Sequence, residues 1–343
     1  MTRVLLTGGS GFIAAHVLEL LLKRGHSVVT TVRSQSKADK IKQAHSDATK
    51  DSLDFFIVED VAKEGAFDEV VQLKPSFEAV IHTASPFHFN VTDVQKQLLD
   101  PAIIGTTGIL QSVKKYAPSV KRMVITSSFA SILDPFAGAR PDHTYSEKDW
   151  NPITQEQALE NPGNGYRGSK TFAEKAGWEF LEKEHPNFTL ATICPPLVLG
   201  PIVHYLNSLD ALNTSNTRLR DYINGTLKNS SDKEMPGPYI WVDVRDVALA
   251  HVNAMERDDA QNKRFFTTAG FFSNSEIVQI LRKNFPEYRD QLPPESWKGG
   301  YRPTPHYGID NSRCEKILGI QWTTLEQSVV DTVKSLQALR SSL

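Results

Sequence analysis

Cysteine is nearly absent from this chain, and long apolar runs are missing. The 343 residues include two cysteines, Cys194 and Cys314, so no disulfide framework is implied. No apolar stretch approaches the roughly 20 residues that a membrane-spanning helix needs. The first residues lead directly into a β-rich run without a signal-peptide pattern. We therefore expect a cytoplasmic protein that does not bind a membrane.

An excess of one charge is also missing. Lys and Arg number 38 and Asp and Glu 40, a net charge of −2, so nothing indicates nucleic acid or an anionic membrane surface as a partner. His82 and His88 flank T-A-S-P-F, but no carboxylate or cysteine stands nearby at ligand spacing. We therefore expect no metal site.

What the chain does have is a glycine-rich turn near its N-terminus. Residues 3–7 read R-V-L-L-T, typical of a buried strand, and G-G-S-G-F-I-A follows before an apolar helical stretch. In this context Gly8 permits a tight turn, Gly11 lets the backbone approach a pyrophosphate, and Ala14 allows close helix–strand packing. The helix N-terminus supplies backbone donors to phosphates. The spacing G-x-x-G-x-x-A differs from the commoner G-x-G-x-x-G, and a plain turn is the alternative.

The end of the next strand indicates which dinucleotide binds. The β-rich run H-S-V-V-T-T-V ends in Arg33, with Lys37 shortly after and no acidic residue at that strand end. An acid there would bind the ribose 2′-hydroxyl of NAD, whereas two cations suit the 2′-phosphate of NADP. We therefore predict NADPH over NADH. The alternative is that both cations are simply solvated at a helix start.

Alternating strands and helices predict the fold class. The candidate strands are Val4–Thr7, Ser27–Val32, Leu53–Val58, Ala79–His82, Arg122–Thr126, Leu190–Cys194 and Arg264–Thr267. This alternation predicts an α/β fold with a doubly wound parallel sheet of the Rossmann type. After Cys194 the pattern changes to loops and short helices, which indicates a smaller, discontinuous α/β substrate lobe. We expect an amphipathic helix around Thr217–Lys228 and a second helix that begins with W-V-D-V-R-D-V-A-L-A-H. We expect an NADP-binding domain of residues 1–198 and 238–268, and a substrate-binding lobe of residues 199–237 and 269–343.

One Tyr-x-x-x-Lys pair stands downstream of these features. Tyr166 and Lys170 lie in N-G-Y-R-G-S-K, one helical turn apart and on one face. An ammonium beside a phenol lowers a pKa that is normally about 10, so the pair predicts a tyrosine that exchanges protons near neutral pH. Such a pair arises often by chance, and its value depends on the dinucleotide signals upstream.

The order of these motifs resembles a known family. G-G-S-G-F-I-A, the strand ending in T-S-S, Y-R-G-S-K and P-P-L-V-L-G-P are similar to extended short-chain dehydrogenase/reductases over nearly the whole chain. H-T-A-S-P-F and V-D-V-R-D-V-A-L-A-H look like the fungal NADPH-dependent aldehyde and ketone reductases of the methylglyoxal reductase type. The active-site stretch N-W-Y-C-Y of the more distant CoA-ester reductases is absent.

This resemblance implies roles for individual residues. Ser128, the second serine of T-S-S, corresponds to the family's catalytic serine, Tyr166 to its acid and Lys170 to its lysine. The loop from Pro195 to Val198 would pack on the nicotinamide. Two positions depart from the family: Ile104 and Cys194 stand where many members carry Asn.

Two sets of site residues are expected, one for the cofactor and one for the substrate. The cofactor-binding residues should be Gly8, Gly11, Phe12, Ile13, Arg33, Lys37, Asp60, Val61, Thr83, Ala84, Ser85, Tyr166, Lys170, Pro195 and Val198. Four apolar residues are candidates for the substrate pocket, with ordinary core packing as the alternative for each: Phe87, Phe89, Phe129 and Leu133.

The resemblance implies NADPH-dependent reduction of small aldehydes, α-dicarbonyls, aryl ketones or ketoesters. Tyr166 would be the general acid, assisted by Ser128 and Lys170. Two alternatives stay open: a reductase or dehydrogenase of larger flavonol-like or 3β-hydroxysteroid-like substrates, and a non-catalytic NADP-sensing protein. A small-molecule carbonyl compound is thus the expected partner, and the protein could be a monomer or a homodimer.

Overall fold

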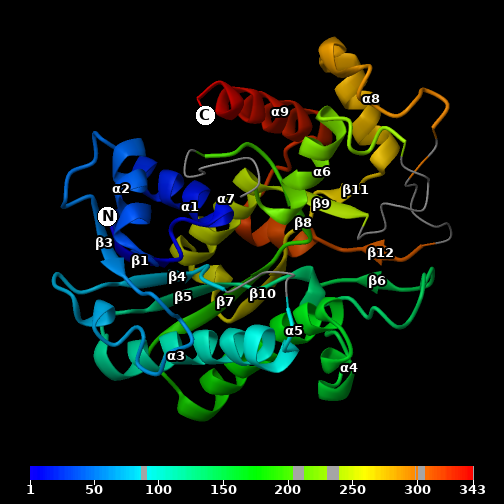
Figure 1. The fold of residues 1–343 in the computed structure, drawn as a ribbon. Coiled ribbons are helices and arrows are strands. Elements are labelled where there is room, and N and C mark those ends of the chain that lie inside the picture. The colour runs from blue at the N-terminus through cyan, green and yellow to red at the C-terminus, as the bar shows by residue number, and fades with distance from the viewer. Residues whose placement is uncertain (86–90, 204–211, 230–238, 298, 300–305, 343) are drawn as a thin grey trace.

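A central seven-stranded sheet organises the molecule (Figure 1). The structure is a computed structural model, and it describes residues 1–85, 91–203, 212–229, 239–297, 299 and 306–342. From one edge to the other the strands are β10 (Lys263–Phe266), β7 (Thr189–Cys194), β5 (Arg122–Thr126), β4 (Ala79–His82), β1 (Arg3–Thr7), β2 (Ser27–Val32) and β3 (Leu53–Ile57).

All pairings in this sheet are parallel, which confirms the predicted doubly wound fold. The chain adds β2 and β3 on one side of β1, and then returns to place β4 on the other side. In such sheets ligands bind at the carboxyl ends of the strands where the order reverses. That point lies between β1 and β4, so Thr7 and His82, which pair in register, mark the edge at which a site should lie.

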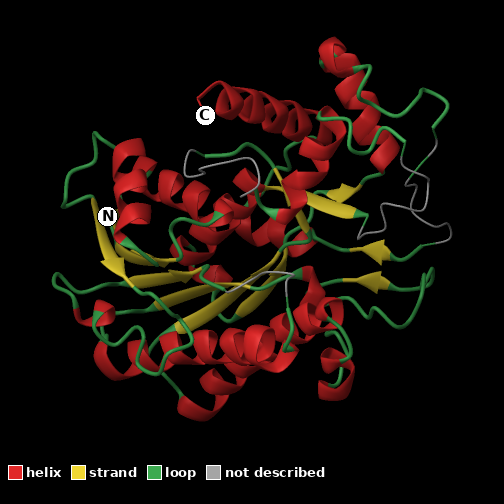
Figure 2. Cartoon of the chain, in the orientation of Figure 1, coloured by secondary structure: helices red, strands yellow, loops and turns green. Residues whose placement is uncertain are grey.

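Helices cover both faces of the sheet (Figure 2). One face carries α1 (Phe12–Lys23), α2 (Gln35–Ala44) and α7 (Val244–Glu256), and the other carries α3 (Asp100–Tyr116) and α5 (Pro162–Glu184). Successive side chains of a strand point to opposite faces. In β1, Val4 and Leu6 accordingly pack in the core on the α1 and α7 side, while Leu5 packs in the core on the α3 side.

A smaller lobe lies beyond the carboxyl end of the sheet (Figure 1). It contains a sheet of β8 (Leu197–Leu199), β9 (Ile240–Asp243) and β11 (Gly270–Phe271), with α6 (Thr214–Ile223), α8 (Asn274–Asn284) and α9 (Leu325–Ser342). A separate core joins these elements, with Trp241 from β9, Leu219 from α6 and Val333 from α9 among its buried residues.

The remaining elements are short. They are η1 (Val70–Gln72), η2 (Gln95–Leu99), η3 (Phe129–Ser131), β6 (Thr144–Tyr145), α4 (Gln155–Leu159), η5 (Asp258–Ala260), η6 (Pro286–Tyr288), β12 (Gly308–Ile309) and η7 (Cys314–Leu318). β6 and β12 pair with each other in parallel. Within the described part of the chain, no helix combines the length and apolar character that crossing a membrane requires.

Two helix boundaries differ from the sequence prediction. W-V-D-V was expected to begin a helix, but Trp241 to Asp243 complete β9, and α7 starts only at Val244. The reason is that the Asp243 carboxylate caps this helix by accepting a hydrogen bond from the Arg245 backbone N–H at 2.8 Å. A helix expected near residues 217–228 ends earlier, at Ile223, because Gly225 adopts φ +80° and breaks it.

Candidate active site

The glycine turn has the geometry that its sequence predicts. Gly8 has φ +75°, and a Cβ at this position would lie 2.9 Å from the Ala84 Cα, so conformation and space both require glycine. Gly11 is the N-cap of α1 and supplies no side-chain cap. The first N–H groups of α1 therefore keep the free donors that a bound phosphate would accept from.

Hydrogen bonds tie the ends of β1 and β4 together beside this turn. The Thr7 Oγ1 lies 2.8 Å from His82 Nδ1 and accepts from the Ala84 N–H at 3.2 Å. The Thr83 hydroxyl donates to the Thr7 carbonyl oxygen at 2.7 Å. Thr83, Ala84 and Ser85 thus lie next to the glycine turn, at the point where the strand order reverses.

The residues expected to bind the ribose and adenine lie on the β2 and β3 side. The Gly8 N–H donates to Thr31 Oγ1 at 3.1 Å, which joins the turn to β2. Arg33, directly after β2, is exposed, and among the described residues neither it nor the partly buried Lys37 forms an ion pair. Asp60 is exposed after β3 and accepts from the Ala62 N–H at 2.9 Å. Both cations are therefore available to an anionic ligand.

The Tyr166 hydroxyl meets Ser128 across the rim of the sheet. It donates to Ser128 Oγ at 3.2 Å, and Ser128 is the N-cap of η3, the turn that follows β5. Tyr166 and Lys170 lie in the first half of α5, whose backbone begins with the Asn161 cap. Gly168, between them, lets α5 approach α4, because a Cβ there would lie 2.5 Å from the Ala158 Cβ. The structure thus brings Tyr166 and Ser128 into contact, with Lys170 one turn further along α5.

The electrostatics of this pair differ from the sequence prediction. We expected Lys170 to lower the Tyr166 pKa, but burial raises that pKa above its usual value, and the hydrogen bond with Ser128 opposes the rise only in part. Burial also lowers the pKa of Lys170 to about 8, against the opposing effect of the Glu174 carboxylate. For each group the loss of hydration thus outweighs the opposing interactions, and the Tyr166 phenol stays protonated at neutral pH.

A small cavity lies beside Lys170. Its volume is about 20 Å³, enough for one water molecule. Its lining combines polar and apolar groups from both layers: His82, Ala84, Ser85, Ala102, Thr106, Ile125, Thr126, Ser127, Lys170, Ala173 and Glu174. Burial lowers the pKa of His82 to about 3, and the nearby Lys170 adds to that effect, so this histidine is neutral.

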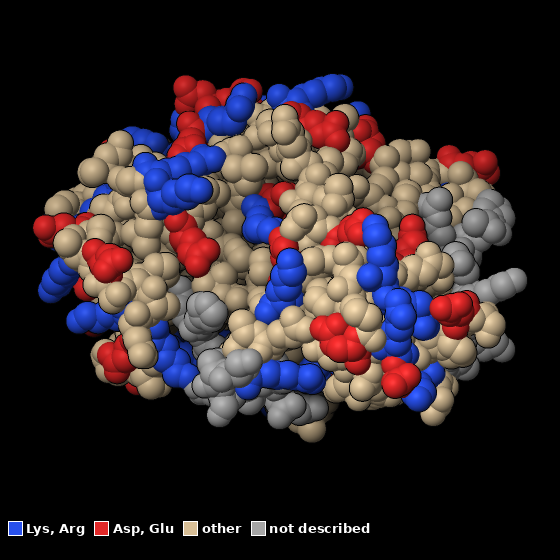
Figure 3. Space-filling view, turned by 90° about the horizontal axis from the view of Figure 1, so that it is seen from above, with Lys and Arg blue, Asp and Glu red and all other residues tan. Residues whose placement is uncertain are grey.

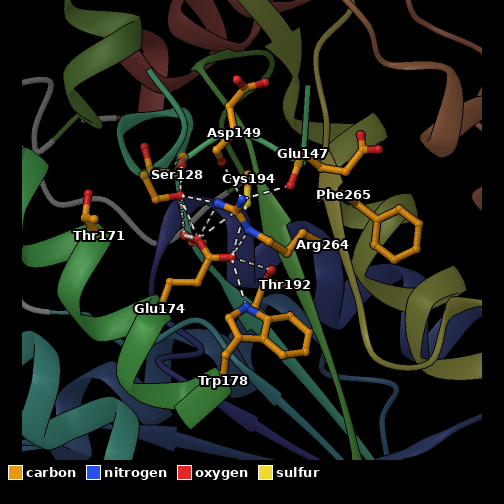
Figure 4. A network of polar contacts seen from close by, with 12 residues as sticks. Ser128, Glu147, Asp149, Thr171, Glu174, Trp178, Thr192, Cys194, Arg264 and Phe265 are labelled. Atoms are coloured by element: carbon orange, nitrogen blue, oxygen red, sulfur yellow. Dashed lines mark hydrogen bonds and ion pairs between the residues drawn. The ribbon is translucent and has the colours of Figure 1, made fainter. Parts of the chain in front are cut away.

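The sequence reasoning missed the buried ion pair between Glu174 and Arg264 (Figure 4). Glu174 is 3% exposed and Arg264 is 7% exposed, and Arg264 Nε donates to Glu174 Oε1 at 2.7 Å. The available signal was the spacing of Glu174, four residues after Lys170 and therefore on the same helix face. Nothing local singles out Arg264 within its strand K-R-F-F.

The predicted substrate-pocket residues are only partly described. Phe87 and Phe89 lie outside the described residues. Phe129 is 3% exposed and stacks on Phe266 with centroids 5.0 Å apart, which favours core packing for this residue. Leu133 is partly buried against the same cluster.

The loop expected against the nicotinamide follows β7. Val198 is 8% exposed, and the Pro195 carbonyl oxygen accepts from the Phe129 N–H at 2.9 Å, so this loop lies next to the Ser128 turn.

The two departures from the family pattern have different surroundings. Ile104 is 41% exposed on α3, whereas Ala102 and Thr106 of that helix line the cavity. An Asn at position 104 would therefore lie on the exposed side of α3, away from the cavity. Cys194 is fully buried, and its Sγ lies 3.8 Å from both carboxylate oxygens of Glu174. Burial raises the pKa of this thiol to about 12, so it stays protonated.

Comparison with known proteins now identifies the family. Residues 4–267 match the profile described as the NAD dependent epimerase/dehydratase family. The chain belongs to this family. Ketoreductase azaE of Aspergillus niger is 45% identical over 336 residues, which are 97% of each chain. The NADPH-dependent methylglyoxal reductase GRE2 of Saccharomyces cerevisiae is 37% identical over 341 residues, again 97% of each.

A solved relative shares the whole architecture. The crystal structure of Gre2 from Candida albicans in complex with NADPH superposes with a TM-score of 0.88 and 38% identity, and the match covers 98% of this chain and 99% of that one. The resemblance to fungal reductases of the extended short-chain dehydrogenase/reductase type is thereby confirmed.

Proposed function

We propose that this protein is an NADPH-dependent carbonyl reductase that converts aldehydes and ketones to alcohols. The observation that carries the proposal is the hydrogen bond from Tyr166 to Ser128, with Lys170 one turn along the same helix, at the rim where β1 and β4 diverge. The relatives named as a ketoreductase and as an NADPH-dependent methylglyoxal reductase support the reaction class.

The residues of the turn and the rim fit a dinucleotide. Gly8 and Gly11 leave the α1 N-terminus open to a pyrophosphate, and the exposed Arg33 and the nearby Lys37 suit a 2′-phosphate. Further contacts would come from Phe12, Ile13, Asp60, Val61, Thr83, Ala84, Ser85, Pro195 and Val198. When bound, NADPH supplies the hydride that reduces the carbonyl carbon.

The chain's own residues would handle the charge that develops on the carbonyl oxygen. Tyr166, kept protonated by burial, donates its proton to that oxygen as general acid. Ser128 Oγ, already within hydrogen-bonding distance of Tyr166, donates to the same oxygen and orients it. Lys170 holds the nicotinamide ribose, and its ammonium favours the phenolate left after proton transfer.

Small and apolar carbonyl compounds are the proposed substrates. The surroundings of the Ser128 turn are aromatic, with Phe129, Tyr145 and Tyr307 in one cluster. Positive and negative side chains are interspersed on the face shown in Figure 3, which has a hollow near its centre. These features suit small aldehydes, α-dicarbonyls, aryl ketones and ketoesters better than a highly charged substrate.

Steady-state oxidation of NADPH, and separately of NADH, tests this proposal. The panel is methylglyoxal, isovaleraldehyde, a diketone, an aryl ketoester and a dihydroflavonol. We expect turnover of the small carbonyls with a preference for NADPH. Turnover confined to the dihydroflavonol would overturn the substrate class. No oxidation of NADPH or NADH with any of the carbonyl compounds, together with tight NADPH binding, would overturn the enzymatic role.

Tyr166→Phe tests the general acid within the same assay. We expect kcat to fall about 10²- to 10⁴-fold, the usual contribution of a positioned acid, with the Kd for NADPH nearly unchanged. Tyr116→Phe is the matched control, because Tyr116 ends α3 near the start of β5, at the amino ends of the strands and away from the site. Loss of NADPH binding with an intact chemical step in Tyr166→Phe would contradict the assignment.

A further inference from the structure

A buried carboxylate lies on the same helix face as the proposed catalytic pair. Glu174 follows Lys170 by four residues and Tyr166 by eight, so all three project from one side of α5. The carboxylate and Lys170 line the same cavity. Carboxylates are almost never fully buried unless they are paired, and the proposed reaction gives this group no step of its own. Its partners therefore indicate what it does.

One oxygen of this carboxylate holds the turn that carries Ser128. Glu174 Oε2 accepts from Ser127 Oγ at 2.5 Å and lies 2.6 Å from Ser131 Oγ. Ser131 Oγ also lies 2.7 Å from the Ser128 carbonyl oxygen, so its single proton is shared between the two acceptors. Ser127 and Ser131 stand on either side of Ser128, and Glu174 thus fixes both ends of the turn to α5.

The other oxygen is anchored to the sheet. Glu174 Oε1 accepts from Thr192 Oγ1 on β7 at 2.7 Å, from Arg264 Nε at 2.7 Å and from Trp178 Nε1 at 3.3 Å. Figure 4 shows these donors converging on the carboxylate. The group therefore joins α5, β7 and β10 at one point.

Arg264 is in turn held in place by the backbone and by an aromatic ring. Its Nη1 donates to the carbonyl oxygens of Glu147 at 2.8 Å and Asp149 at 2.6 Å. Its guanidinium stacks on Trp150, with the Cζ atom 3.6 Å from the ring centroid. Its Nη2 completes the fork, 3.2 Å from Glu174 Oε2. The planar guanidinium matches the carboxylate geometry in a way that a lysine could not.

The charge of Glu174 also acts on Lys170. Burial would raise the pKa of Glu174, but Arg264 and the hydrogen bonds from Ser127 and Ser131 bring it below its usual value. The titratable groups that act on Lys170 in the described structure are His82 from β4, Cys194 from β7 and Glu174 on its own helix, where Tyr166 lies one turn before it. Helix α3 contributes Ala102 and Thr106, which do not titrate. Glu174 is thus the anionic neighbour that opposes the deprotonation of Lys170.

We propose that Glu174 is a positioning residue, which with Arg264 holds the Ser128 turn against the helix face that carries Tyr166 and Lys170. This inference rests on the proposed function for its catalytic meaning, although the geometry it describes can be tested independently. A buried ion pair is weak evidence for stability as such. What indicates positioning is that Glu174 contacts Ser127 and Ser131, which lie on either side of Ser128.

The test compares Glu174→Gln with Asp246→Asn. Glutamine keeps the size of the side chain and removes its charge. Asp246 is the control because it is also a buried acid, 5% exposed, and lies in the first turn of α7. It accepts hydrogen bonds from the backbone N–H and the hydroxyl of Thr323. For each protein, the measurements are kcat, KM, the Kd for NADPH, the pH profile of kcat and the melting temperature.

We expect kcat of Glu174→Gln to fall about 10- to 100-fold with little change in KM or in the Kd for NADPH. The basic limb of its pH profile should move to lower pH, because Lys170 loses the anion that favours its charged form while Arg264 stays positive. Asp246→Asn should change the melting temperature but neither kcat nor the profile. Wild-type kcat and pH profile in Glu174→Gln would overturn the inference whatever its melting temperature.

Two further measurements keep the result decisive. If Glu174→Gln does not fold, the Ser127→Ala/Ser131→Ala double variant removes the same contacts to the turn and leaves the ion pair in place. We expect a lower kcat with an unshifted basic limb, and wild-type kcat there would overturn the inference. Crystal structures of wild type and variant provide a readout without turnover: the Tyr166–Ser128 hydrogen bond should be lost. If the wild type reduces no carbonyl, the proposed function fails, and the structures alone still decide whether Glu174 positions the turn.

Discussion

The two halves of the sheet rim are built in different ways. On the β1 and β2 side, the groups suited to a ligand are backbone N–H donors at the glycine turn and exposed side chains such as Arg33. On the β5, β7 and β10 side, they are side chains held by buried partners, with Glu174 and Arg264 behind Ser128. Under the proposed function, the first half would bind the cofactor through open backbone donors, and the second would act through a fixed arrangement of polar side chains. Substitutions in the two halves should therefore change cofactor binding and catalysis in different ways.

Gly8→Ala should have the largest effect on the backbone half. Left-handed φ costs an L-residue about 1–2 kcal/mol, and the new Cβ would also crowd Ala84, 2.9 Å away. The turn must shift to relieve that contact, so it should lose hydrogen bonds to the cofactor phosphates, each worth about 1 kcal/mol. We expect the Kd for NADPH to rise by roughly 100-fold by titration calorimetry.

Gly25→Ala is the matched control for that effect. Gly25 has a nearly identical φ, +77°, but nothing lies within 4 Å of its added Cβ. It should lose about the same 1–2 kcal/mol of folding stability to backbone strain, while NADPH affinity stays as in the wild type. Equal affinity losses in the two variants would show that strain alone, rather than crowding at the turn, weakens binding.

The contrast between the halves also explains what the sequence could and could not reveal. Gly8, Gly11 and the strands around them follow from local patterns, because a strand, a turn and a helix start are encoded by adjacent residues. Ser128 and Tyr166 were singled out through the motif order of the family, and in the structure they form a 3.2 Å hydrogen bond. Arg264, 90 residues beyond Glu174, has no local signal, because its role depends on β10 lying beside β7.

The direction of the Tyr166 pKa was missed for a related physical reason. Helix spacing predicts that Lys170 lies near the phenol, but it does not predict how much water the folded protein removes from both groups. In the structure, desolvation is the larger effect for each. The pattern of residues therefore located the pair, whereas its titration depends on burial by elements distant in the chain.

Arg33→Ala should have a smaller and more selective effect. The side chain is exposed and forms no ion pair within the described residues, so the melting temperature of the cofactor-free protein should not change. The KM for NADPH should rise about tenfold, equivalent to about 1.4 kcal/mol, while that for NADH stays constant. Lys42→Ala, in the last turn of α2, removes an equal charge as the control. Equal losses with both cofactors would show that Arg33 does not read the 2′-phosphate.

Ile104→Asn should have the smallest effect, although it restores the residue type that many family members were expected to carry there. Ile104 is 41% exposed and points away from the cavity-lining positions of α3, so its replacement should change stability by less than about 0.5 kcal/mol and leave kcat unaltered. Ala102→Asn is the informative partner, because Ala102 lines the cavity with Lys170 and an added amide would occupy the space of one water. If the pH profile of kcat shifts in Ala102→Asn and not in Ile104→Asn, the position of α3 at which the family's Asn matters is the buried one. A shifted pH profile in Ile104→Asn alone would show that a contact from the exposed side of α3 reaches the β5, β7 and β10 side of the rim. The division between the two halves would then be wrong.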